Sequence, residues 1–186
     1  MPNYTHLHFT GHGYYNFDDP KRSALEFENK SLLTAYEINQ LNFNSYKLIT
    51  LAACETALNG NQTIDSEYVG LVSAFIKGGA NCVLSTLWTV DETSSAWLII
   101  YFYQQYYSRI TPKIALKNAQ YWLQTVNNHK LVIWLTELLE DTKHKEIDPH
   151  VIELVQDEIN KYKQRNPNNK RYENPYYWLG FIVHQL

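Results

Sequence analysis

Residues 46–53 read YKLITLAA, a nearly continuous apolar run that ends immediately before Cys54. Such a run is typical of a strand whose two faces are both covered by helices. A second run, ANCVLSTL at residues 80–87, follows a predicted helix at about 66–77 that a glycine pair terminates. Strands that alternate with helices in this way predict an α/β sheet flanked by helices on both faces.

The beginning of the chain adds another strand to this prediction, from Tyr4 to Thr10, which ends at Gly11-His12-Gly13. A polar stretch at 14–30 follows, and we expect it to form a surface hairpin or loop. The connection to the run before Cys54 is long enough to cross over, so the two strands can lie parallel. Active sites of such sheets lie at the carboxyl ends of strands, and His12 and Cys54 would therefore meet there.

The rest of the chain is predicted to be mainly helical, with one final strand. A short capped helix is expected at 31–38, and Asp91 or Thr93 would cap a later helix. The remaining predicted elements are a helix at 111–125, two helices within 129–165 and an aromatic strand at 176–183.

His12 and Cys54 are the residue types that a cysteine peptidase requires. A thiolate attacks the peptide carbonyl, and an imidazole activates the thiol and protonates the departing amine. Glycine at position 13 has no Cβ, so the N–H groups of Gly13 and Cys54 would hold the oxyanion. Taken alone, the same residues also fit a turn histidine and a buried packing cysteine.

Composition narrows the class of protein. With 45% hydrophobic residues in 186, the chain is globular, and a formal net charge of -3 gives no general attraction to nucleic acid or to anionic membranes. No apolar run reaches the roughly 18 residues that a membrane span needs, and the N-terminus does not resemble a signal peptide. The two cysteines, Cys54 and Cys82, show no zinc or redox spacing, which favours a reducing, cytoplasmic location.

Five stretches of the sequence occur in an order that is specific to one family. They are HFTGHG (8–13), LAACETALNG (51–60), GLVSAFIKGGANCVLSTLWTVDE (70–92), ALKNAQ (115–120) and NPYYWLGFIV (174–183). These motifs resemble those of CHAT domains, caspase-like domains that occur with tetratricopeptide repeats and are related to caspases and separases. The resemblance implies a mostly parallel caspase-like sheet, a catalytic dyad of His12 and Cys54, and no cofactor.

Two features depart from the family pattern. CHAT domains usually contain further strands and helices before the HG motif, so residues 1–186 are expected to be a single domain without the usual N-terminal part. The segment 129–172 is longer than the usual link and is interpreted as a helical insertion for regulation or docking. An incomplete sheet leaves an open edge, which suggests a homodimer, a partner that supplies the missing part, or a tetratricopeptide-repeat partner as the family implies.

Other residues carry weaker hypotheses. His6 and His8 share a strand face with His12 and would suit a metal ion, but no acidic ligand accompanies them, and we expect no metal. Glu55 and Asp91 would favour a basic residue before the scissile bond, with Trp88 as a wall of the substrate cleft. Asp91 also fits a helix cap, and Trp88 and Cys82 also fit core packing.

The sequence therefore predicts a bacterial, cytoplasmic cysteine endopeptidase that cleaves a protein substrate through Cys54 and His12 and is regulated by a partner. The alternative is a non-catalytic interaction module that retains the caspase-like fold.

Overall fold

The computed structural model describes residues 4–16, 18–55, 69–88, 90–143 and 145–185. Within these residues the chain forms a six-stranded sheet in the order β3-β2-β1-β4-β5-β6. The strands are β1 (His6–Tyr14), β2 (Ala24–Glu26), β3 (Leu32–Thr34), β4 (Leu48–Glu55), β5 (Cys82–Thr86) and β6 (Phe181–Gln185). The neighbours β1, β4 and β5 run parallel, whereas β2, β3 and β6 pair antiparallel. The predicted α/β caspase-like class is confirmed, with a parallel centre inside a mixed sheet.

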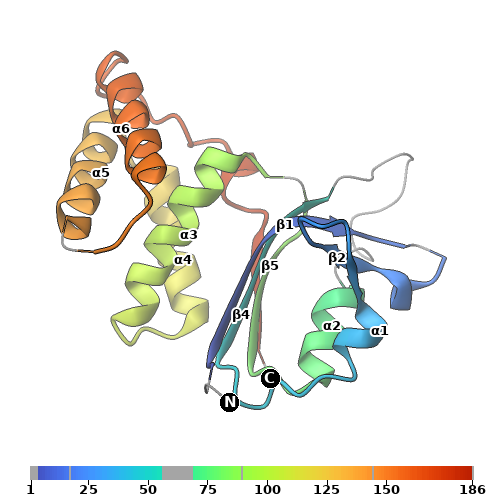
Figure 1. Ribbon diagram of the computed structural model, residues 1–186. Coiled ribbons are helices and arrows are strands. Elements are labelled where there is room, and N and C mark those ends of the chain that lie inside the picture. Colours follow the sequence, from blue (N-terminus) through green and yellow to red (C-terminus); the bar gives the residue numbers. More distant parts are fainter. Residues whose placement is uncertain (1–3, 17, 56–68, 89, 144, 186) are drawn as a thin grey trace.

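Helices cover both faces of the sheet (Figure 1). One face carries α1 (Ala35–Ile38) and α2 (Val69–Lys77), together with the 3-10 turn η1 (Pro20–Arg22). The other face carries α3 (Glu92–Tyr107) and α4 (Pro112–Thr125). The two layers of helices explain why β4 and β5 are largely apolar on both faces.

Alternate residues of the central strands enter two separate cores. Leu48 of β4 and Leu84 of β5 pack in the core under α3 and α4. Ile49 and Leu51 of β4 pack with Val83 of β5 in the core under α1 and α2. Because successive side chains of a strand point to opposite faces, one strand supplies both cores.

The helix ends follow the predicted signals. After α2, Gly79 adopts a φ of 100°, and the N–H of Ala80 donates to the carbonyl of Phe75 over 3.0 Å. This is the glycine-terminated helix end that the sequence predicts. Asp91 caps α3 by accepting a hydrogen bond from the Ser94 N–H over 2.8 Å, whereas Thr111 makes no such side-chain bond to α4.

Strand β1 is longer than predicted, because His12 and Gly13 lie inside it and not in a turn after it. The polar stretch predicted as a hairpin or loop contains η1 and β2, the first strand of an antiparallel hairpin. Its second strand, β3, occupies the start of the helix predicted at 31–38, which begins only at Ala35 after the Thr34 cap. The hairpin turn holds Lys30 at a φ of 64°. Pairing with this hairpin on one side and with β4 on the other extends β1 to Tyr14.

Two further helices, α5 (Asn128–Thr142) and α6 (Pro149–Lys163), pack against each other beyond the sheet, next to the layer of α3 and α4 (Figure 1). They confirm the two helices predicted within 129–165. Fully buried hydroxyl groups of Tyr162 and Tyr172 form a hydrogen bond, and the indole N–H of Trp97 donates to Tyr162 over 3.4 Å. This contact joins α6 and the segment after it to α3.

The aromatic C-terminal stretch divides into two elements. A 3-10 turn, η3 (Pro175–Tyr177), precedes β6, so the strand begins at Phe181 and not at residue 176 as predicted. Proline at the start of the turn lacks an N–H and cannot donate to a strand ladder. Searching the described residues for a helix long and apolar enough to cross a membrane finds none.

Candidate active site

The register of three neighbouring strands places Glu26, His12 and Cys54 in one row across the sheet. In the parallel ladder of β1 and β4, the Cα of His12 is the partner of the Cα of Cys54. In the antiparallel ladder of β1 and β2, His12 is the partner of Glu26. Neighbouring strands lie about 4.8 Å apart, so position 12 has an acidic residue on one side and a cysteine on the other.

His12 is exposed and lies in the last third of β1, near the carboxyl end of the strand. Its face of the strand is that of His8 and Thr10, because side chains alternate along β1. His8 and Thr10 are themselves joined by a hydrogen bond of 2.9 Å between Nε2 and Oγ1. This alternation sets His12 on the sheet face that carries α3.

Glu26 is the charged neighbour of His12. Its Oε1 accepts a hydrogen bond of 2.8 Å from the Lys30 ammonium, and its side chain is 25% exposed. The pKa of Glu26 is lowered, first by this hydrogen bond and by the charge of Lys30, and to a smaller extent by the charge of His12. A carboxylate that stays ionised beside an imidazole can orient the ring and stabilise its protonated form.

Cys54 and Glu55 are the last two residues of β4, and their side chains lie outside the described part of the structure. Gly13 is buried and paired on both sides, with Glu55 of β4 and with Leu25 of β2. Residues 56–68, which include the first residues of the predicted helix at 66–77, also lie outside the described residues.

Trp88 and Asp91 follow the carboxyl end of β5, as predicted. The Trp88 indole packs on the backbone of Gly180, where an added Cβ would lie 3.0 Å from the ring atom Cε2. The Asp91 carboxylate is occupied as the cap of α3. Both residues therefore have structural roles, and among the described residues no hydrogen bond or ring contact joins either of them to His12.

His6 and His8 contact aromatic residues of α3. The Nε2 of His6 lies 3.2 Å from the Tyr106 hydroxyl, and the Nδ1 of His8 lies 2.9 Å from the Tyr103 hydroxyl. The Tyr103 hydroxyl also lies 2.7 Å from the Oγ1 of Thr50 in β4. Burial lowers the pKa of both histidines. They act here as hydrogen-bonding residues between β1 and α3, and the described residues hold no group of three metal-ligating side chains.

Cys82 is the second cysteine and lies in the core under α3, only 2% exposed. Burial raises the pKa of its thiol to about 11. A thiol with such a pKa stays protonated near neutral pH and is a poor nucleophile. This agrees with the expected packing role of Cys82.

Of the three residues in the row, Glu26 is the one that the sequence did not predict as part of the site. The polar stretch around it was assigned to a hairpin or loop without a register, and only the pairing of β2 with β1 brings Glu26 beside His12. The alternating pattern SALEF at residues 23–27 is the signal that could have located the strand.

Comparison with known proteins identifies the family. The sequence matches the family model of the CHAT domain over residues 1–185. A mouse protein, Tetratricopeptide repeat protein 28, is 34% identical over 94 residues, which are 50% of this chain and 4% of that protein. The chain therefore corresponds to a small part of this much longer relative, and a mouse relative lends no support to the expected bacterial source.

Proposed function

Because the chain belongs to the CHAT family of caspase-like domains, we propose that it is a cysteine endopeptidase that cleaves protein substrates with Cys54 and His12. The observation that carries this proposal is the register of β1 and β4, in which these two residues are direct partners in a parallel ladder. Paired positions of a parallel ladder share a face of the sheet. A thiol at position 54 and an imidazole at position 12 would thus be close enough to interact.

The proposed reaction follows from this arrangement. Cys54 transfers its proton to His12, and the thiolate attacks the peptide carbonyl carbon to form a tetrahedral oxyanion. The N–H groups of Gly13 and Cys54 are assigned to the oxyanion, and each would have to leave the strand pairing of β1 and β4 to reach it. The intermediate collapses as the C–N bond breaks and His12 gives its proton to the amine. Water then hydrolyses the thioester, releasing the carboxylate product and the thiol.

Glu26 is assigned the role of a positioning residue for His12. It lies on the side of His12 opposite Cys54, and its carboxylate stays ionised beside the imidazole. It would favour the protonated ring that forms in the first step. Lys30 competes for the same carboxylate through the 2.8 Å ion pair, which limits the strength of this effect.

The test is the rate at which a peptidyl electrophile labels Cys54, measured by mass spectrometry of peptides. His12→Ala should slow labelling by at least about 100-fold, as expected when a general acid–base is removed. Cys82 serves as the internal control, because its buried thiol with a pKa of about 11 should stay unlabelled. If Cys54 reacts no faster than Cys82 in the unaltered chain, this chain alone is not a competent peptidase.

The role of Glu26 has its own test. Glu26→Gln keeps the shape of the side chain but removes its charge, so labelling should slow by roughly tenfold and the pH at which the rate is half-maximal should shift. Lys30→Gln is the matched control, because it removes the competing ion pair and leaves the carboxylate facing His12. An identical pH profile for Glu26→Gln and the unaltered chain would leave Glu26 without this role.

Substrate and partners form the remaining part of the proposal. Glu55 at the end of β4 and Asp91 after β5 would favour a basic residue before the scissile bond, with Trp88 as a wall of the substrate cleft. The relationship to a tetratricopeptide-repeat protein supports regulation by such repeats. A homodimer also stays a proposal, as do the single-domain boundary and the role of 129–172 as an insertion. The unpaired, buried Cys82 supports a reducing compartment such as the cytoplasm.

A Cys54→Ala variant separates this function from that of an interaction module. Loss of substrate cleavage in the cell with unchanged partner binding supports the peptidase. Retention of every biological effect by Cys54→Ala would instead favour the non-catalytic module.

A further inference from the structure

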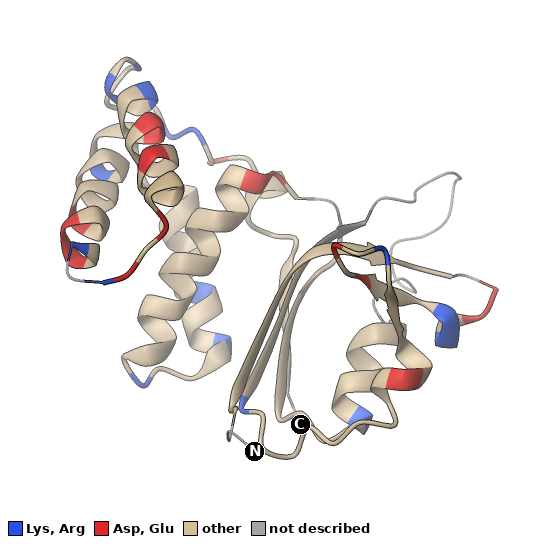
Figure 2. Ribbon diagram, in the orientation of Figure 1, with Lys and Arg blue, Asp and Glu red and all other residues tan. Residues whose placement is uncertain are grey.

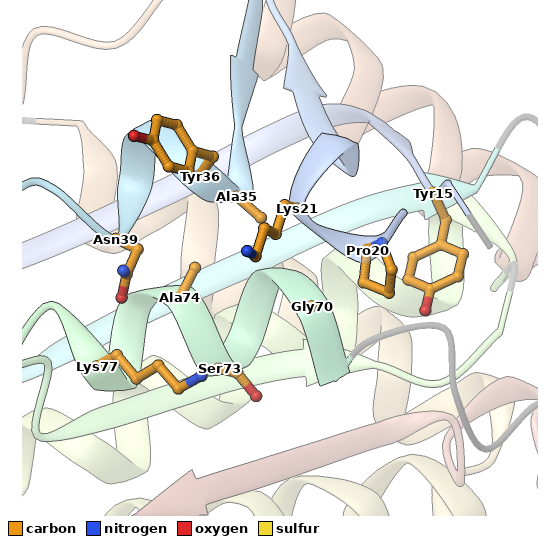
Figure 3. Close-up of a pocket in the computed structure, with 10 residues that line it drawn as sticks. All are labelled: Tyr15, Pro20, Lys21, Ala35, Tyr36, Asn39, Gly70, Ser73, Ala74 and Lys77. Carbon is orange, nitrogen blue, oxygen red and sulfur yellow. The ribbon is translucent and has the colours of Figure 1, made fainter. Parts of the chain in front are cut away.

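A cavity of about 500 Å³ lies on the sheet face opposite α3 and α4, between η1, α1 and α2 (Figure 3). Volumes of roughly 300–1,000 Å³ are usual for sites that bind small molecules. No step of the proposed peptide hydrolysis uses this cavity.

The floor of the cavity consists of small residues. Ala35 of α1 and Gly70 and Ala74 of α2 line it. An added Cβ at Gly70 would lie 3.0 Å from the carbonyl oxygen of Pro20, so the glycine allows η1 to pack closely on α2. The small side chains keep a space open between elements that would otherwise be in contact.

Polar and positively charged side chains surround this floor. Lys21 of η1 points into the cavity, and Lys77 lies along α2 with its ammonium group next to Ser73 (Figure 3). Neither lysine forms an ion pair with the described residues, and the ten described residues that line the cavity include no Asp or Glu. Two ammonium groups beside one cavity, with no acidic side chain in its described lining, favour a negatively charged ligand.

Hydrogen-bond donors and aromatic rings complete the lining. The side chains of Ser73 and Asn39 can donate to an anion, and lysine is a common phosphate-binding residue. Tyr36 is 59% exposed at the rim, so its ring is free to contact a planar group. Tyr15, which lines the opposite end, is buried.

We propose that this cavity binds a small organic phosphate of nucleotide size, with its phosphate groups between Lys21 and Lys77 and its planar group against Tyr36. The site is separate from the row of Glu26, His12 and Cys54 and does not depend on peptidase chemistry. Its lining nevertheless comes from the segments that follow β1 and precede β5, so a bound ligand would join η1, α1 and α2 to one another.

The test is calorimetric titration of the full chain with adenosine diphosphate. The double variant Lys21→Ala/Lys77→Ala should bind at least about tenfold more weakly, since each charge-assisted contact contributes substantially to affinity. The matched control is Lys113→Ala/Lys117→Ala, which removes the same charge from exposed positions of α4 on the other face and should bind as the unaltered chain does. Equal weakening in both double variants would mean a general charge effect and would overturn the site.

Three further measurements make the outcome decisive. Tyr36→Ala should weaken binding of adenosine diphosphate but leave binding of inorganic pyrophosphate unchanged, because only the nucleotide has a planar group. Cys54→Ala should bind adenosine diphosphate normally, which separates this site from the peptidase proposal. Circular dichroism melting of each variant checks that it is folded. No binding by the folded, unaltered chain at millimolar adenosine diphosphate, or preferential binding of an acidic peptide, would overturn the proposal.

Discussion

The two faces of the sheet are covered in different ways. The face under α3 and α4 is aromatic and hydroxyl-rich, with histidines of β1 hydrogen-bonded to tyrosines of α3. The core under α1 and α2 is mainly aliphatic, with a ring contact between Phe43 and Phe75, and a cavity bordered by lysines lies beside it. Charged residues are few on both layers of helices: the described α1 and α2 carry Glu37 and Lys77, and α3 and α4 carry Glu92, Lys113 and Lys117 (Figure 2). One sheet therefore supports two different layers. We call the layer of α3 and α4, with its side-chain hydrogen bonds, the thick layer, and the layer of η1, α1 and α2, with its open cavity, the thin layer.

Deleting a large ring from either core should have the largest effect on stability. Phe102 of α3 is fully buried, and Phe75 of α2 is 1% exposed. Replacing either one with Ala should lower the free energy of unfolding by about 3–5 kcal/mol, because it leaves a cavity in a close-packed core. Urea unfolding measures the free energy lost in each of the two variants. A much smaller loss for Phe75→Ala would show that the thin layer collapses into the space.

The buried tyrosine pair of the thick layer should come next. Tyr172→Phe leaves the Tyr162 hydroxyl without its closest partner and should cost about 1–3 kcal/mol. The double variant Tyr162→Phe/Tyr172→Phe removes both hydroxyl groups, although it leaves the Trp97 N–H without its acceptor. Its loss in the free energy of unfolding should therefore be smaller than the sum of the losses in the two single variants. Additive losses in urea unfolding would contradict this coupling.

The thin layer depends on its helix cap. Helix α1 spans only Ala35–Ile38, and the Thr34 Oγ1 accepts from the Glu37 N–H over 3.2 Å while Glu37 Oε2 accepts from the Thr34 N–H over 2.8 Å. Thr34→Ala should cost about 0.5–2 kcal/mol in urea unfolding. Thr34→Ser keeps the capping oxygen and is the control. Equal losses in the two variants would rule out the cap as the cause.

Lowering the pH should have the smallest of these effects on stability, and it acts mainly through histidines under α3. Burial lowers the pKa of His6 and His8 on the thick side, and it also lowers that of His184 in β6. The unfolded chain therefore takes up protons first as the pH falls, so stability is complete above about pH 6.5 and declines below it. The urea concentration at the unfolding midpoint should therefore decrease when the pH is lowered from about 7.5 to about 5.5. His8→Asn should reduce this dependence, and a midpoint that rises on acidification would contradict it.

Local patterns in the sequence predicted most of the fold. Apolar runs located β4 and β5, and the glycine pair at 78–79 located the end of α2, since burial on both faces and a left-handed residue at a helix end leave clear signals. The extension of β1 through His12 left no such signal, because it depends on pairing with β2, a three-residue strand.

The row of candidate catalytic residues was only partly predictable. Family motifs identify His12 and Cys54, but the place of Glu26 depends on register, and a shift of one residue would move it to the other face. The cavity was not predictable either, because Lys21 and Lys77 are far apart in the sequence and meet only when η1 packs on α2.

The position of β6 has a consequence for biosynthesis. This strand pairs with β5, although all of α3, α4, α5 and α6 separate them along the chain. A ribosome adds about 5–20 residues per second, so β5 has an open edge for several seconds before its neighbour emerges. Helices α5 and α6 lengthen that interval. The nascent chain thus offers an aggregation-prone edge for longer than a shorter connection would, and a chaperone that shields β5 would act in that interval.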